Sequence, residues 1–205
     1  MTWRYWTTII FVLLFVAGPD SIAANAPSKS GAQRRAASTP INDFHLIDER
    51  GAPFAFDNLS GRVIVVAFVY TSCPDVCPLI TSSLRQVQVG LKTEELKKVH
   101  LLTVTTDPEI DQPKILLAYG QRYGADFATW SFLTGDPAAL KKVWQNFGVG
   151  VKRKGRGLID HTPLTAIVDQ KRVLRFGYVG PSPDPSTVLS DIRVLLAEHV
   201  GTPAH

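Results

Sequence analysis

The sequence predicts a three-layer α/β domain, with a central β-sheet between layers of helices. Two apolar runs, 63–70 and 100–105, have the composition of strands that are buried on both faces. Between them, from Leu79 to about Lys98, apolar residues recur at helical spacing. A strand, a helix and a second strand in this order are typical of layered α/β proteins, so we expect that architecture here.

The remaining elements follow from local patterns. Apolar segments 44–47 and 53–56 flank a polar turn and predict a small hairpin. Helices are expected over 113–123 and 137–147, because each begins with Pro, which is favoured at the first helical position. The further predicted elements are a short strand over 130–133, a hairpin of strands 164–168 and 172–178, and an amphipathic closing helix over 186–199. This order is thioredoxin-like: a three-layer fold with a central mixed β-sheet flanked by helices, extended by an extra N-terminal β-hairpin.

The composition is that of one globular domain with extensions. The chain has 205 residues, of which 45% are hydrophobic and 20% charged, which excludes disorder throughout. A polytopic membrane protein is excluded because apolar spans of ~20 residues are not repeated. The net charge, 22 − 18 = +4, makes the protein basic, but its basic run is not interleaved with aromatic residues. We therefore expect no nucleic-acid partner.

The N-terminus has the pattern of an export segment. Residues 1–26 combine a single cation, Arg4, with a nine-residue apolar run, Ile9 to Ala17, and a small-residue region suited to cleavage. The run is short of the ~20 residues that cross a bilayer, so a signal peptide or a short membrane anchor is expected. The folded domain would then lie in the periplasm, soluble or tethered to the inner membrane. We expect a flexible linker over 27–40, the domain over 41–200 and a tail over 201–205.

A close cysteine pair marks the end of the first central strand. Cys73 and Cys77 are the two cysteines of the chain, which excludes a disulfide scaffold and a four-cysteine zinc site. They lie where a helix begins, a position that stabilises thiolate, the form that attacks disulfides and binds metals. Residues four apart share one helix face, so the spacing permits both metal binding and redox cycling. A purely structural disulfide would close too small a loop to stabilise the fold much.

Two thiolates suit a soft ion of low coordination number such as Cu(I), with a third donor from elsewhere. Thioether is excluded because the one Met is the initiator. Among the five histidines, His161 lies just before the predicted strand 164–168, and in a thioredoxin-like domain that loop packs against the cysteine helix. We therefore expect His161 to face the thiols. His45 is expected on a solvent-exposed strand face, and the remaining three at the surface or as caps: His100, His199 and His205.

At these residues the chain resembles the Sco (SCO/SenC) family of copper proteins. The resemblance spans roughly residues 41–198 and rests on four segments in family order. They are Tyr70-Thr71-Ser72-Cys73-Pro74-Asp75-Val76-Cys77-Pro78, Asp107-Pro108-Glu109-x-Asp111-x-Pro113, Leu133-Thr134-Gly135-Asp136 and Asp160-His161-Thr162. Two departures are visible: Ser72 stands where many members have His, and the N-terminal apolar segment is shorter than their anchor helix.

The resemblance implies one copper ion per chain, Cu(I) with Cu(II) as an alternative, bound by Cys73, Cys77 and His161. It implies that Asp160 tunes or orients His161 and that Asp107 and Asp111 are supporting residues. The family's role implies that the chain assembles the dinuclear copper site of cytochrome c oxidase, by delivering copper or by reducing that site's cysteines. The implied partner is therefore the copper-site subunit of the oxidase or another copper-receiving protein.

Two alternatives use the same cysteines without copper. In a thiol–disulfide oxidoreductase Cys73 would be the attacking thiol and Cys77 the resolving one, with a periplasmic thiol reductase as a further partner. A thiol peroxidase is disfavoured, because the preceding strand has no Pro and the motif has no Arg to polarise a peroxide. The basic segment from Lys152 to Arg156 is either a solvated loop or a docking surface for an acidic partner or anionic lipid headgroups.

Overall fold

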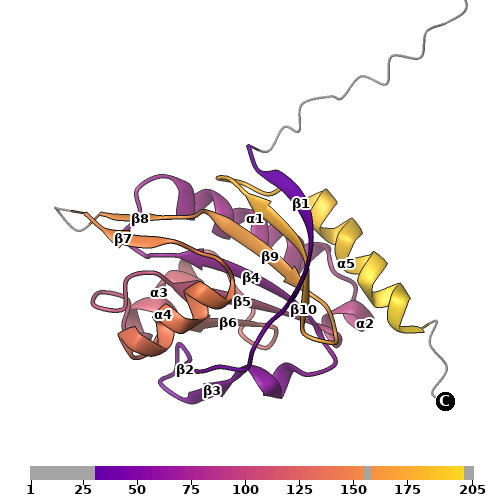
Figure 1. Cartoon of the computed structure of the whole chain (residues 1–205), viewed down its shortest axis with the longest axis horizontal. Helices are drawn as coiled ribbons and strands as arrows, with labels where there is room; N and C mark the ends of the chain where they lie inside the picture. The colour runs from indigo at the N-terminus through magenta and orange to yellow at the C-terminus, as the bar shows by residue number, and fades with distance from the viewer. Residues whose placement is uncertain (1–30, 155–157, 201–205) are drawn as a thin grey trace, which may run out of the picture.

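The computed structural model describes residues 31–154 and 158–200, with side chains to Glu198 (Figure 1). Several expected features lie outside the described residues: the export segment 1–26, the start of the linker, Arg156, the tail 201–205 and the side chain of His199. None of the helices within the described ranges has both the length and the apolar character that a membrane crossing requires.

The domain is built on a six-stranded mixed sheet, which confirms the predicted thioredoxin-like class. The strand order is β1-β10-β9-β4-β5-β6; β4, β5 and β6 are parallel to one another, and the pairs β4–β9, β9–β10 and β10–β1 are antiparallel. Its strands are β1 (Gln33–Pro40), β4 (Val63–Val69), β5 (Val99–Thr105), β6 (Trp130–Leu133), β9 (Leu164–Val168) and β10 (Val173–Val179). The predicted extra hairpin is also present, as β2 (His45–Ile47) and β3 (Pro53–Ala55).

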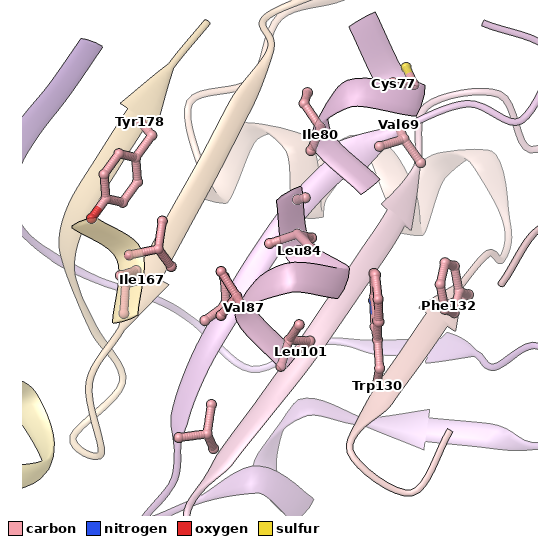
Figure 2. Packing of buried hydrophobic residues seen from close by; sticks show 14 of the residues in the cluster. Val69, Cys77, Ile80, Leu84, Val87, Leu101, Trp130, Phe132, Ile167 and Tyr178 are labelled. Atoms are coloured by element: carbon pink, nitrogen blue, oxygen red, sulfur yellow. The ribbon is translucent and has the colours of Figure 1, made fainter. Parts of the chain in front are cut away.

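Helices cover both faces of this sheet. On one face lie α1 (Val76–Gly90), α3 (Pro113–Arg122) and α5 (Pro185–Val200); on the other lie α4 (Pro137–Asn146), the β2–β3 hairpin and the 3-10 turn η1 (Phe56–Leu59). All seven residues of β4 are buried, because alternate side chains enter the two cores. Figure 2 shows the first core, where Ile80, Leu84 and Val87 of α1 pack toward the strands and Cys77 lies at its end.

The first long helix is shorter than expected. The apolar spacing predicted one helix from Leu79 to about Lys98, but α1 ends at Gly90 and Leu91 is extended. At Gly90 a Cβ atom would lie 2.6 Å from a methyl group of Leu189, so the glycine lets this side chain of α5 pack directly against the end of α1. A separate short helix, α2 (Thr93–Leu96), then carries the remaining periodic residues.

The segment expected as a flexible linker is partly a strand. Residues 33–40 form β1, which pairs antiparallel with β10 from Gln33↔Val179 to Pro40↔Val173. Arg34 binds the carboxylate of Asp191 with Nε and Nη2, at 2.6 and 2.8 Å, and its guanidinium lies 4.3 Å from the ring centroid of Phe176. The expectation was wrong because the pairing is made by backbone groups on the free edge of β10, which composition does not reveal.

A second hairpin was also not expected. The loop before Pro163 contains β7 (Val151–Arg153) and β8 (Ile159–His161), which pair with each other and form a sheet of their own. Three-residue strands without an apolar run give no periodic signal. This hairpin projects at one end of the domain (Figure 1), at the edge where β4 ends and β9 begins.

Candidate functional site

The two cysteines lie on either side of the start of α1. Cys77 is in the first turn of the helix and fully buried, whereas Cys73 precedes the helix and is partly exposed. The turn between β4 and α1 is closed by the Cys73 amide, which donates to the carbonyl of Tyr70 at 3.2 Å. The Cys77 amide donates to Cys73 Sγ at 3.4 Å. The sulfurs are therefore neighbours, but through a turn that folds back onto the helix N-terminus rather than through a shared helix face.

His161 reaches the cysteines from β8, as its place in the chain predicts. Its Nε2 atom lies 3.8 Å from Cys77 Sγ, although the two residues are 84 apart in sequence. Nδ1 lies 3.1 Å from the carbonyl oxygen of Thr162, which assigns the ring proton to Nδ1 and leaves the Nε2 lone pair toward sulfur. The ring stands edge-on to Tyr70, with 5.9 Å between centroids. Two sulfurs and one nitrogen thus come together from distant parts of the chain.

The two thiols differ in acidity because they share a proton. A hydrogen bond from Cys77, aided by the amides of Asp75 and Cys77, lowers the pKa of Cys73 to about 5. The same hydrogen bond, together with burial, raises the pKa of Cys77. Burial lowers the pKa of His161 and raises that of Tyr70 to about 12. At neutral pH the site therefore holds one partly exposed thiolate, one buried thiol and a neutral imidazole.

Asp111 secures the turn that bears Cys73. Its carboxylate is fully buried and accepts hydrogen bonds from the Thr71 amide at 3.1 Å, the Thr71 hydroxyl at 2.5 Å and the Thr105 hydroxyl at 2.5 Å. Burial raises the pKa of Asp111 in spite of these donors. Since Thr71 follows β4 and Thr105 ends β5, Asp111 ties the ends of the two central strands together beneath the cysteines. Asp107 is buried nearby and accepts a hydrogen bond from Arg153 on β7.

Asp160, which the resemblance implies tunes or orients His161, acts on it through charge: its carboxylate raises the pKa of His161, against the larger lowering by burial. Its carboxylate is exposed and pairs with Lys154 Nζ at 2.8 Å, an interaction that lowers the pKa of Asp160. The reason is strand alternation: neighbouring residues of β8 point to opposite faces, so Asp160 points away from the thiols when His161 points toward them. The hydrogen-bond partner at Nδ1 of His161 is the Thr162 carbonyl.

The other described histidines lie away from the cysteines. His45 is exposed, as expected. His100 was expected at the surface, but only 7% of it is exposed, and its Nε2 atom lies 3.0 Å from the hydroxyl of Ser131. It is at the start of β5, whereas the cysteines follow the opposite end of the neighbouring β4. Burial lowers the pKa of His100 to about 4, so it is a neutral core residue.

An open pocket of about 250 Å³ lies between the cysteine turn and β8. Its lining combines one thiol and the imidazole with apolar and acidic residues: Tyr70, Cys73, Pro74, Asp75, Val76, Leu158, Ile159, Asp160, His161 and Pro163. Across residues 31–154 and 158–198, no three Cys, His, Asp or Glu side chains are already arranged around one point as a metal cluster. The thiols and the imidazole are adjacent, however, and the exposed thiolate opens onto this pocket.

Sequence reasoning missed three residues at this site. Tyr70 packs against His161, Thr71 donates hydrogen bonds to Asp111 from its amide and its hydroxyl, and Arg153 pairs with Asp107. Tyr70 and Thr71 stand beside Cys73 in the motif and could have been considered for that reason. Arg153 gave no signal, because it lies in a run of basic residues that reads as a solvated loop.

Comparison with known proteins agrees with this fold. The sequence model of the SCO1/SenC family matches residues 32–197. The SCO2-like protein of Rickettsia felis is 31% identical over 150 residues, which cover 69% of this chain and 70% of that protein.

Solved structures show the same likeness. The SCO1/SenC family lipoprotein from Bacillus anthracis is 27% identical, with a TM-score of 0.73 over 79% of this chain and 98% of that one. Bradyrhizobium japonicum ScoI, solved with copper bound, is 28% identical, with a TM-score of 0.61 over 77% of this chain and 99% of that one. The chain therefore belongs to the SCO1/SenC family.

Proposed function

We propose that this chain binds one copper ion through Cys73, Cys77 and His161 and delivers it to the dinuclear copper site of cytochrome c oxidase. The observation that carries the proposal is the approach of His161 Nε2 to Cys77 Sγ, at 3.8 Å, beside the thiolate of Cys73. Two thiolates and an imidazole are soft to intermediate donors, and three of them match the low coordination number of Cu(I). Structural zinc would need a fourth ligand.

Delivery needs a site that a partner can enter. Cys73 is partly exposed at the pocket, whereas Cys77 is buried. A partner's ligands would therefore approach from the Cys73 side, and Cys77 and His161 would be the last donors to release the ion. Oxidation of the two thiols to a disulfide removes both thiolates, so copper affinity depends on the redox state of the pair.

Reduction of the partner's cysteines is the second candidate function, and the acidity of Cys73 favours it. The exposed Cys73 thiolate would attack a partner disulfide and form a mixed disulfide, with one partner thiolate leaving. Cys77 would then lose its proton and attack Cys73, which releases the second partner thiolate and leaves a Cys73–Cys77 disulfide. Two electrons pass to the partner, and an external thiol reductase would have to restore the pair.

We also propose that the domain works outside the cytoplasm, in the periplasm, as the export pattern of residues 1–26 indicates. The topology suits a tether at the N-terminus. Gln33 is the first residue of β1 and pairs with Val179 of β10. Val179 in turn pairs with Leu164, the first residue of β9. That is the sheet edge of the cysteines, and β1 is three strands from β4, or roughly 14 Å. A membrane-held N-terminus would keep the site close to the membrane surface and to a membrane-bound recipient.

An anaerobic Cu(I) competition titration on the fully reduced chain tests the metal site. We expect one Cu(I) per chain, no retention in Cys73→Ser or Cys77→Ser, and weakened binding in His161→Ala. Tight 1:1 binding that persists in a variant with both cysteines replaced by Ser would refute the proposal.

The two candidate functions are separated with the recipient's copper domain. Copper-loaded chain is mixed with the reduced, metal-free domain, and metal-free reduced chain with the oxidised domain. Delivery predicts copper transfer in the first mixture, and reduction predicts free thiols on the recipient in the second. His161→Ala is the matched control, since it should impair copper transfer while leaving thiol exchange intact.

A further inference from the structure

The hairpin that carries His161 is not part of the main sheet. β7 and β8 have three residues each and form a separate two-stranded sheet. Two-stranded ribbons of this kind are at best marginally stable by themselves. Apart from the short connection from β8 to β9, the position of His161 over the thiols therefore depends on the side chains that fasten this hairpin to the domain.

The two faces of the hairpin have different partners. Val151 pairs with His161 and Arg153 with Ile159, so these four side chains share the face turned toward the domain, where Ile159 is buried. Asp160, on the opposite face, pairs with Lys154 in solvent. Arg153 is thus the charged residue on the same face as His161.

The guanidinium of Arg153 pairs with a buried aspartate, Asp107. Its Nη2 atom donates to Oδ1 of Asp107, whose side chain is fully buried, and lies 3.2 Å from Oε2 of the exposed Glu109. Asp107 follows β5, at the same sheet edge as the cysteine turn. Its second oxygen, Oδ2, has no hydrogen-bond partner within residues 31–154 and 158–198. Loss of its ion-pair partner would leave a buried carboxylate without compensation for its charge, which is costly. The Arg153–Asp107 pair therefore holds Arg153 in place more firmly than an ion pair between two exposed side chains would.

We infer that Arg153 is a positioning residue: its ion pair with Asp107 holds the β7–β8 hairpin against the domain and so fixes His161 over Cys77. The inference rests on the proposed copper site and adds to it the ion pair that keeps His161, the ligand distant in sequence, in place. The hydrophobic contact of Ile159 holds the hairpin against the domain but does not prevent it from shifting along the surface. A charge-assisted hydrogen bond to a buried carboxylate is directional, so it fixes the position of the hairpin relative to the cysteine turn.

The test compares two neighbouring residues of the full chain. Arg153→Gln removes the inward ion pair, and Lys154→Gln removes the outward one as the matched control. Cu(I) affinity of the reduced chain is measured by competition, and hydrogen exchange of the 158–163 segment is measured on the metal-free chain. We expect Arg153→Gln to weaken Cu(I) binding by about 10- to 100-fold, as residues that orient a metal ligand typically do, and to speed exchange. Lys154→Gln should leave both unchanged.

Three further readouts separate positioning from a general loss of stability. Arg153→Lys should restore most of the affinity, and alkylation of Cys73 should proceed at the parent rate in Arg153→Gln. In the His161→Ala background, Arg153→Gln should cause no additional loss, because the residue acts through His161. If Arg153→Gln does not fold, Asp107→Asn decides in its place: weakened binding supports the inference and unchanged binding overturns it.

The outcomes also distinguish this inference from the proposed function. If the parent chain binds Cu(I) and His161→Ala weakens it, but Arg153→Gln behaves like Lys154→Gln, the inference is overturned and the copper site stands. If the parent chain binds no Cu(I), the proposed function itself fails, and the inference fails with it.

Discussion

The proton shared by the two thiols predicts how many protons leave the chain when Cu(I) binds. With a pKa of about 5, Cys73 is about 99% ionised at pH 7. The pKa of Cys77 is raised by its hydrogen bond to Cys73 and by burial, so Cys77 keeps its proton. The pKa of His161 is lowered by burial, so its ring is neutral. The three proposed ligands therefore hold one displaceable proton between them.

Binding to two thiolates and a neutral imidazole must remove that proton. We expect about one proton to be released per Cu(I) at pH 7, whereas two independent thiols with ordinary pKa values of ~8.5 would release about two. The sign of the pH dependence follows: release of one proton makes the affinity rise about tenfold per unit of pH near neutrality, and fall by the same factor as pH is lowered.

Isothermal titration in two buffers of different ionisation enthalpy measures the proton count. Cu(I) is added anaerobically to the reduced chain, and the proton exchange of the Cu(I) donor is measured separately. His161→Ala is the control, because a neutral imidazole contributes no proton and the count should stay near one. A count near two for the parent chain at pH 7 would refute the shared proton and the preformed Cys73 thiolate.

Further predictions concern the same site and the fold around it. Alkylation of Cys73 by iodoacetamide should rise with pH and be half-maximal near pH 5; a midpoint near the ordinary thiol value of ~8.5 contradicts the shared proton. Asp111→Ala removes a buried carboxylate that accepts three hydrogen bonds and should lower the free energy of unfolding by about 3 kcal/mol in urea titrations; an unchanged midpoint would argue against its role in holding the turn. His100 has a pKa of about 4 when folded and ~6.5 when unfolded, so the unfolded chain binds more protons between these values. Stability should fall by about 3 kcal/mol as pH decreases from about 6.5 to 4, and His100→Gln should remove that part of the pH dependence. Arg34→Ala should speed hydrogen exchange in β1, and equal exchange would show that the backbone ladder alone holds the strand.

Local sequence patterns were sufficient for most of the fold. The apolar run of β4 and the Pro-initiated helices α3 and α4 lie where their patterns predict, because burial on two faces and capping leave a signal within a few residues. The cysteine pair was identified for the same reason: its position between a buried strand and a helix is a local property.

Features made by pairing between distant segments were not predictable in this way. β1 is a strand because β10 offers a free edge, and β7–β8 is a hairpin in a segment that reads as a polar loop. Asp160 points outward because of the register in which β8 pairs with β7. A shift of that register by one residue would turn every side chain of β8 to the other face.

The sequence by itself determined the fold class, the two thiols and His161 as the third candidate ligand, since these depend on periodicity, spacing and element order. Only the tertiary structure decided how those groups differ. It placed Cys77 in the core and Cys73 at the surface, so that one proton is shared unequally between them. It also joined Arg153 to the buried Asp107, 46 residues away in the chain. Burial and charge pairing are properties of packed neighbours, and such neighbours are brought together by folding alone.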